Sequence, residues 1–257
     1  MLKFWPAALT ALAFILISAC GGSPETSQEE NAPPAESFEV DPATAGSISG
    51  RVSFQGDPPN PRPINMGSDV DCRQLHEEPV MPETLVVGEE GGLRWVFVRV
   101  KSGLEGKTFA APAEAVTMDQ RGCIYRPHMV GIQANQTLKV TNSDPTLHNV
   151  HPLPRENSEW NRSQAAGAGA IEEKFPKPEL MIPIKCNIHP WMRAWINVVE
   201  NPFFAVTGEG GTFEIKGLPP GTYTLEAIHE QLGAKDMEVT LGAGETKSAD
   251  FVFEQQG

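Results

Sequence analysis

The sequence predicts an all-β protein of the sandwich class, carried behind a leader and a polar segment. Short runs rich in β-branched and aromatic residues recur from residue 46 onwards, and turn sequences such as DPP, GGT and LPPG separate them. No stretch shows a sustained helical period. Short strands between glycine and proline turns are typical of β-sandwiches. We expect strands at 47–54, 94–100, 138–142, 195–199, 212–217, 222–228 and 251–253.

Residues 1–19 have the layout of a secretory signal peptide. A lysine precedes an apolar run over 4–17, which is shorter than the roughly 20 residues that a membrane span needs. The run ends in Ile17-Ser18-Ala19-Cys20, which resembles a bacterial lipoprotein signal with Cys20 as the lipidated residue. Gly21 stands where a retention aspartate could be, which favours the outer membrane. This predicts a lipid-anchored protein facing the periplasm or the cell surface; the alternative is an ordinary cleaved signal with an incidental cysteine.

Residues 20–45 are expected to be a disordered acidic tether. Positions 21–45 hold six acidic residues and no basic ones, with few large apolar side chains. Such a composition cannot bury enough surface to offset chain entropy. The tether contributes to a formal net charge of −13, which argues against a nucleic-acid partner because phosphate binding needs a basic face.

The cysteine count predicts one disulfide. If Cys20 carries lipid, three cysteines remain in an oxidising compartment, and one of them stays unpaired. Cys186 lies in a cluster of metal-ligand types, so we expect Cys72 and Cys123 to pair. Closing such a loop of about fifty residues contributes ~4 kcal/mol through the unfolded state.

A rival interpretation gives these two cysteines to a metal. Cys72 is followed by His76 and Cys123 by His128, so two cysteines and two histidines could form one site. This spacing is loose, and secretion favours oxidation of the pair.

The stretch CNIHPWM concentrates soft metal ligands. Cys186, His189 and Met192 supply a thiolate, an imidazole and a thioether within seven residues. A copper site for electron transfer needs two imidazoles, one thiolate and a weak axial thioether. The second imidazole is expected from His148, which follows a turn at 143–147 and begins a strand. His151 is three residues further on and therefore faces the opposite side of that strand.

Three further histidines are expected to lie outside this site, and two other kinds of site fit the residues less well. We expect His128 to be structural, and His76 and His229 to lie at the surface. Zinc takes four firm ligands and has no use for a thioether. A nucleophilic Cys186 with His189 as its base lacks a third, orienting group.

The runs VTNSDPTLHNVH and CNIHPWMRAWINVV resemble the cupredoxins, the type 1 blue copper family, and in particular their amicyanin-like members. The resemblance covers about 117–200 and implies a Greek-key sandwich that binds copper and transfers electrons. It implies four ligands: His148, Cys186, His189 and Met192.

The same resemblance assigns a supporting role to Asn149, behind the ligands, where it would fasten the ligand loop. Asn135 stands where the family usually has a turn glycine, and asparagine tolerates a positive φ. The segment 155–179 has no clear counterpart in the family.

Residues 46–58 and 205–228 resemble the two ends of a carboxypeptidase regulatory-like domain, a small transthyretin-like sandwich. We therefore expect this sandwich at 46–105 and 201–257, with the copper domain at 106–200 inserted into it or in tandem with it. Phe213 and Ile215, like Tyr223 and Leu225, alternate so as to bury one face of each strand.

These features predict an electron carrier rather than an enzyme, because electron transfer requires no substrate pocket. His189 is expected to be the ligand nearest solvent, with Pro190 and Trp191 beside it as an apolar docking patch for a redox protein. The alternative is an extracytoplasmic copper-binding, adhesion or structural module without redox turnover.

Overall fold

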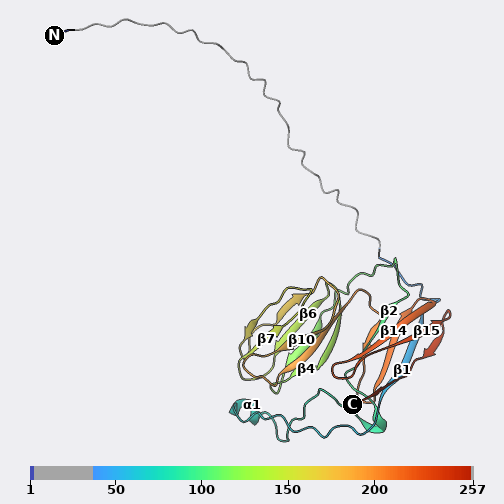
Figure 1. Ribbon diagram of the computed structural model, residues 1–257, viewed down its shortest axis with the longest axis horizontal. Helices are drawn as coiled ribbons and strands as arrows, with labels where there is room; N and C mark the ends of the chain where they lie inside the picture. The colour runs from blue at the N-terminus through green and yellow to red at the C-terminus, as the bar shows by residue number, and fades with distance from the viewer. Residues whose placement is uncertain (3–36, 256–257) are drawn as a thin grey trace. The chain divides into compact units, whose positions relative to one another are not determined.

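The computed structural model describes residues 1–2 and 37–255, and the latter pack as one compact unit (Figure 1). The chain there is almost entirely β-strand, which confirms the predicted fold class. None of the helices in these ranges is long and apolar enough to cross a membrane. The predicted signal, Cys20 and most of the predicted tether lie outside the described residues.

The first pair of sheets is built from both ends of the described chain. One sheet has the order β13-β1-β16, with β17 also paired to β1, and the other has the order β12-β2-β14-β15. Their strands are β1 (Gly46–Gln55), β2 (Phe97–Ser102), β12 (Phe204–Val206), β13 (Thr212–Leu218), β14 (Gly221–His229), β15 (Gly233–Leu241), β16 (Thr246–Ser248) and β17 (Phe251–Glu254).

The core of this pair follows the predicted alternation. Phe213 and Ile215 on β13 and Tyr223 and Leu225 on β14 are all buried in one apolar cluster between the sheets. β2 begins at Phe97, three residues later than expected, because Trp95 has a φ of 62° that interrupts the extended backbone.

The second pair of sheets lies between β2 and β12 in the chain. One sheet has the order β5-β11-β10-β7-β8 and the other β4-β3-β6-β9. Their strands are β3 (Val116–Gln120), β4 (Tyr125–Arg126), β5 (Met129–Gln133), β6 (Thr137–Asn142), β7 (His148–Pro152), β8 (Arg162–Gln164), β9 (Ile171–Lys174), β10 (Glu179–Lys185) and β11 (Arg193–Val199). Asn135, between β5 and β6, has a φ of 69°, as its place in the turn predicted.

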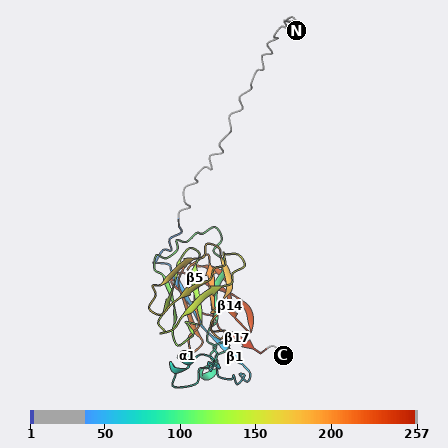
Figure 2. The ribbon, with the colours of Figure 1, turned by 90° about the vertical axis from the view of Figure 1, so that its left-hand side faces the viewer.

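The chain leaves the first pair of sheets and returns to it at neighbouring points. β12 pairs antiparallel with β2, and Phe204 lies opposite Arg99. Gly131 on β5 allows the close approach of the two pairs, since a Cβ there would lie 2.5 Å from the ring of Phe204 and 2.6 Å from that of Phe97. Figures 1 and 2 show the two pairs of sheets from directions 90° apart. The exact domain boundaries stay a prediction.

The segment between β1 and β2 contains the two short helices, α1 (Val70–Gln74) and η1 (Glu89–Gly91). Asp69 caps α1 by accepting a hydrogen bond from the backbone N–H of Cys72 at 2.9 Å. The disulfide between Cys72 and Cys123 joins α1 to the loop between β3 and β4. The segment is thereby fastened to the second pair of sheets, where α1 lies in Figure 1.

Candidate metal centre

Three of the four predicted ligands converge at one end of the second pair of sheets. His148 is the first residue of β7, and Cys186 and His189 lie in the turn between β10 and β11. β7 and β10 are neighbours in one sheet, which brings the two segments together. The ligand atoms of these three residues all lie within 4.8 Å of one another. The two Nδ1 atoms are 2.9 Å apart, and Cys186 Sγ is 3.7 Å from His189 Nδ1.

Met192 closes the turn that carries Cys186 and His189. Its backbone N–H donates to the carbonyl of His189 at 2.9 Å, and its carbonyl accepts from the N–H of Cys186 at 3.2 Å. The side chain is fully buried in the same apolar cluster as Cys186. The turn therefore directs a cysteine, a histidine and a methionine into the end of one core.

Each imidazole is oriented by a carboxylate. His148 Nε2 donates to Asp144 Oδ2 at 2.8 Å, and His189 Nε2 donates to Asp69 Oδ2 at 3.0 Å. A carboxylate only accepts, so each Nε2 carries a proton, and the two Nδ1 atoms face the same point. Two lone pairs 2.9 Å apart need a cation between them, either a proton or a metal ion.

Asp144 is held rigidly by the turn before β7. Its two oxygens accept from the backbone N–H groups of Gly122 and Cys123 at 2.6 and 2.7 Å. Burial alone would raise the pKa of this carboxyl, but the bonds from His148 and from these N–H groups lower it below its ordinary value. Burial lowers the pKa of His148, yet its bonds to Asp144 and Cys186 outweigh burial and raise it to about 9.

His189 is covered rather than exposed, which corrects the expectation that it lies nearest solvent. Its exposed fraction is 1%, because Asp69 at the start of α1 closes over Nε2. Trp191 packs beside it with ring centroids 5.3 Å apart. The pKa of Asp69 is lowered by the backbone N–H of Cys72 and then by the bond from His189.

The thiol of Cys186 lies among hydrogen-bond donors. The backbone N–H of Asn149 approaches Sγ at 3.5 Å, and the Asn149 side-chain oxygen accepts from the N–H of Asn187 at 2.5 Å. Burial alone would raise the pKa of Cys186, but His148 and nearby backbone N–H groups lower it to about 6. Asn149 therefore fastens the loop as expected, and the thiol is ready to ionise at neutral pH.

The disulfide prediction is confirmed. Cys72 and Cys123 are bonded, and Cys186 is the free cysteine of the described residues. Both disulfide sulfurs lie within 4.8 Å of a ring nitrogen of His189. The disulfide therefore borders the metal centre and also joins α1 to the loop between β3 and β4.

The rival site of two cysteines and two histidines is not formed. His76 Nε2 donates to the carbonyl of Gly122 at 2.7 Å, and His128 Nε2 bonds to Glu230 at 2.5 Å. Both rings therefore have partners other than the disulfide sulfurs. His128 is buried, and His76 is half-buried.

The two remaining histidines differ in outcome. His151 faces away from the ligands and bonds to Glu159 at 2.7 Å and Asn187 at 3.2 Å, as the strand alternation predicted. The expectation of a surface position for His229 is wrong, since it is 2% exposed. β14 continues through His229, and the ring packs near Phe253, with centroids 6.5 Å apart.

Sequence reasoning missed the two carboxylates. Asp144 carried a usable signal, because it stands four residues before His148 in the turn that leads to the ligand strand. Asp69 carried none, because it lies 120 residues before His189, at the start of a short helix in the segment between β1 and β2.

The donor set suits a single soft or borderline transition-metal ion. Bonds from such an ion to nitrogen and sulfur are about 2.0–2.3 Å, and donors within 4.8 Å of one another can share one ion at that range. Two imidazoles with a thiolate, and a thioether nearby in sequence, form the combination that copper uses in electron-transfer sites. The residues present therefore fit copper.

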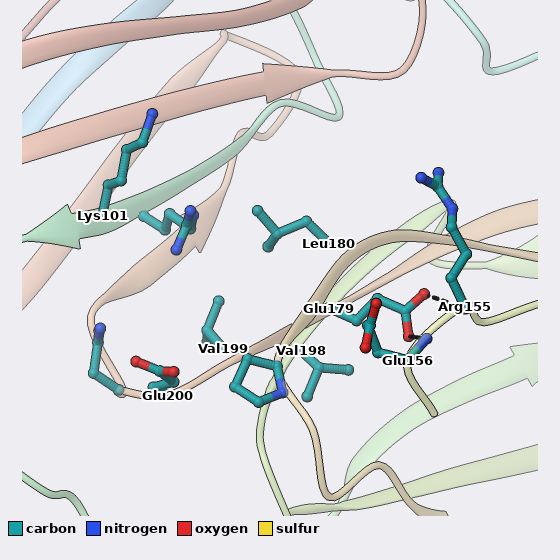
Figure 3. A pocket seen from close by; sticks show the side chains of 11 residues that line it. Lys101, Arg155, Glu156, Glu179, Leu180, Val198, Val199 and Glu200 are labelled. Atoms are coloured by element: carbon teal, nitrogen blue, oxygen red, sulfur yellow. Dashed lines mark hydrogen bonds between the residues drawn. The ribbon is translucent and has the colours of Figure 1, made fainter. Parts of the chain in front are cut away.

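A separate hollow of about 430 Å³ offers no comparable convergence (Figure 3). Arg99 and Lys101 on its wall are already paired with Glu226 at 2.8 and 3.0 Å. Glu179 accepts from the backbone N–H of Arg155 at 2.6 Å. None of the four predicted ligands lines this hollow.

Comparison with known proteins finds partial matches among solved structures. No family model and no curated protein matches the chain. Solved structures that it is similar to include a Cu-containing nitrite reductase from Thermus scotoductus (19% identity, 39% of this chain, 26% of that one, TM-score 0.33). A second is a purple cupredoxin from Nitrosopumilus maritimus (18% identity, 32% of this chain, 98% of that one, TM-score 0.29). A third is a Cu(I) mutant of amicyanin (20% identity, 39% of this chain, 97% of that one, TM-score 0.30). The structural neighbours are thus cupredoxins and a copper enzyme, over a minor part of this chain.

Proposed function

We propose that the protein binds one copper ion and carries single electrons between redox partners. The observation that supports this most is the pair of Nδ1 lone pairs, 2.9 Å apart beside the Cys186 thiol, with each Nε2 held by a carboxylate. When bound, copper supplies the one-electron redox couple. Cys186, His148 and His189 would hold it, with Met192 as a further, weak ligand.

The chain's own contribution is a site prepared in advance. Asp144 and Asp69 keep both rings in the metal-binding tautomer, and Asn149 fixes the loop. The lowered pKa of Cys186 means that the thiol ionises without a large cost at neutral pH. A metal-binding group must be deprotonated, so this raises affinity for copper near pH 7.

We place electron transfer ahead of catalysis because the three donor residues are all buried. A catalytic metal keeps an open position for water or substrate, whereas this site is enclosed by α1, Trp191 and the core. The runner-up, a copper-binding or adhesion module without redox turnover, shares the site but needs no reversible cycling.

A redox partner would dock at the metal end of the second pair of sheets, around His189, Pro190 and Trp191. Pro190 is exposed, and two large apolar side chains on the ligand segments are also accessible: Ile188 is 46% and Leu147 45% exposed. A small apolar face of this kind suits transient redox encounters, which bury under ~1,200 Å².

Membrane attachment through a lipid on Cys20 belongs to the same proposal. It rests on Ile17-Ser18-Ala19-Cys20 and on the acidic stretch that follows. Membrane fractionation of the wild type and of Cys20→Ser tests it, with mass spectrometry of the N-terminal peptide. A fully soluble wild type whose mass lacks a lipid would reject the anchor while leaving the copper assignment untouched.

The decisive experiment is reconstitution of the metal-free protein with copper, followed by an absorption spectrum and voltammetry. An electron carrier shows an intense visible thiolate-to-copper band and cycles reversibly. A protein that binds copper without that band would favour the runner-up. His128→Gln is the matched control, since it alters a buried histidine outside the ligand set.

A further inference from the structure

Residues 64–80 form a cover over His189, and three separate contacts hold it there. The disulfide fixes Cys72 to the β3–β4 loop, and His76 bonds to the carbonyl of Gly122 in the same loop. Met66 is buried in the core of the second pair of sheets. The backbone N–H of Ile64 donates to the carbonyl of Val80 at 2.8 Å, which closes the cover at its base.

The loop beneath is shaped to receive this cover. Gly122 has a φ of 71°, and a Cβ there would lie 2.7 Å from Cε1 of His76. Only glycine permits both the left-handed backbone and the close imidazole. Trp191 Nε1 donates to the carbonyl of Cys123 at 3.1 Å, so the ligand turn bonds to the loop that anchors the cover.

Asp69 divides its two oxygens between two tasks. Oδ1 accepts from the N–H of Cys72 and caps α1, and Oδ2 accepts from His189 Nε2. A cap needs only the first contact. The second reaches a residue 120 positions away and leaves its ring 1% exposed, which capping does not explain.

We propose that Asp69 is a positioning residue for His189, and that the disulfide-anchored cover carrying it controls access of solvent and small ligands to the metal centre. The inference rests on the proposed function for its metal, but the burial of Cys186, which is 2% exposed, is observed without one. Asp69 holds the His189 tautomer and places a negative charge behind the ring. That charge favours the more positive oxidation state of a metal bound at Nδ1.

The first test uses the metal-free chain in a Cys20→Ser background, where Cys186 is the free thiol of the described part. Its rate of reaction with dithionitrobenzoate reports opening of the cover. We expect slow reaction in the parent and at least about tenfold faster reaction in Cys72→Ser/Cys123→Ser, since local opening then costs less. Circular dichroism checks that the variant is folded.

A milder pair of variants distinguishes the contact of Asp69 with His189 from its capping of α1. Asp69→Ser keeps a good capping residue but removes the carboxylate that contacts His189. Asp71→Ser changes an exposed carboxylate on the same helix and is the matched control. We expect a faster thiol reaction for Asp69→Ser and parental behaviour for Asp71→Ser. Equal rates of thiol reaction in the parent, Asp69→Ser and the disulfide-free variant would contradict the proposal that residues 64–80 control access.

The second test uses the copper-loaded chain. Asp69→Ser should raise the reduction potential and change the visible spectrum, while Asp71→Ser leaves both as in the parent. In His189→Gly, added imidazole should restore the band far more readily once Cys72 and Cys123 are serine. Unchanged potential and spectrum would reject the positioning role. A shielded thiol in a chain that binds no copper would instead reject the proposed function and leave the cover standing.

Discussion

Two pairs of buried histidines lie in this molecule, and only one of them forms a candidate metal centre. His148 and His189 each give Nε2 to a carboxylate and turn Nδ1 towards a thiol. His128 gives Nε2 to Glu230, while His229 Nε2 is buried without a partner. The imidazole rings are thus buried in both pairs. The first pair differs because its two Nδ1 atoms face each other beside a thiol.

The pKa values of His148 and His229 distinguish the two pairs in the same way. The carboxylate and thiol beside His148 overcome burial and raise its pKa to about 9. Burial lowers the pKa of His229 to about 4, and the nearby Glu230 does not compensate. A cation is therefore favoured at the first pair and excluded at His229.

Cys186→Ser should have the largest effect on the first pair. It removes the only free thiol of the described residues, so the intense visible band should disappear entirely on copper reconstitution. His229→Leu, in the second pair, should keep the band. An intense band in Cys186→Ser would contradict the ligand assignment.

The next prediction concerns the thiol of the metal-free protein. In the Cys20→Ser background, ultraviolet thiolate absorption should appear with a midpoint at about pH 6, well below the ordinary 9.0. His148→Ala removes the hydrogen bond that does most to favour the thiolate, so the midpoint should rise and the absorption at pH 7 should fall. An unchanged midpoint in His148→Ala would show that the two residues are not coupled.

The second pair, through His229, should make the stability of the folded protein sensitive to acid. The folded-state pKa of His229 is below its unfolded value of 6.5, so the unfolded chain binds more protons between pH 6.5 and 4. Stability is therefore lost as pH falls through that window, by up to about 3 kcal/mol at ~1.4 kcal/mol per unit. His229→Leu should remove this loss, as measured by urea unfolding at pH 7 and pH 4.5. Equal acid sensitivity in both proteins would refute the role of His229.

Met192→Leu should have the smallest effect on metal binding. A thioether is a weak axial donor that tunes the potential rather than holding the metal. The variant should keep copper and its colour while the potential rises, as measured by voltammetry. Loss of copper in Met192→Leu would mean that the roles within CNIHPWM are assigned wrongly.

Local patterns predicted most of the centre, and long-range packing decided the rest. The spacing of Cys186, His189 and Met192 and the turn before His148 were readable because each lies within one short segment. The all-β class and the disulfide were likewise predictable and are confirmed. The carboxylate of Asp69 was not, because its partner depends on how an irregular segment folds back over the site.

The burial of single residues was the second property that the sequence did not predict. The surface expectation for His229 failed because Phe253, in the last strand, packs near its ring. The solvent-facing expectation for His189 failed because α1 covers it. In both cases the covering residue comes from a distant part of the chain, which periodicity within one strand or loop cannot reveal.

The neighbourhood of the disulfide has a consequence for how the protein is assembled in the cell. Cys186 Sγ and the two disulfide sulfurs all lie close to the ring of His189. The three cysteines of the described residues can pair in three ways, and only one of these pairings leaves Cys186 available. A thiolate with a pKa of about 6 also attacks disulfides readily near neutral pH. If the protein binds copper as proposed, early loading would occupy that thiolate, and the order of metal delivery and disulfide formation would then set the yield of correctly paired protein.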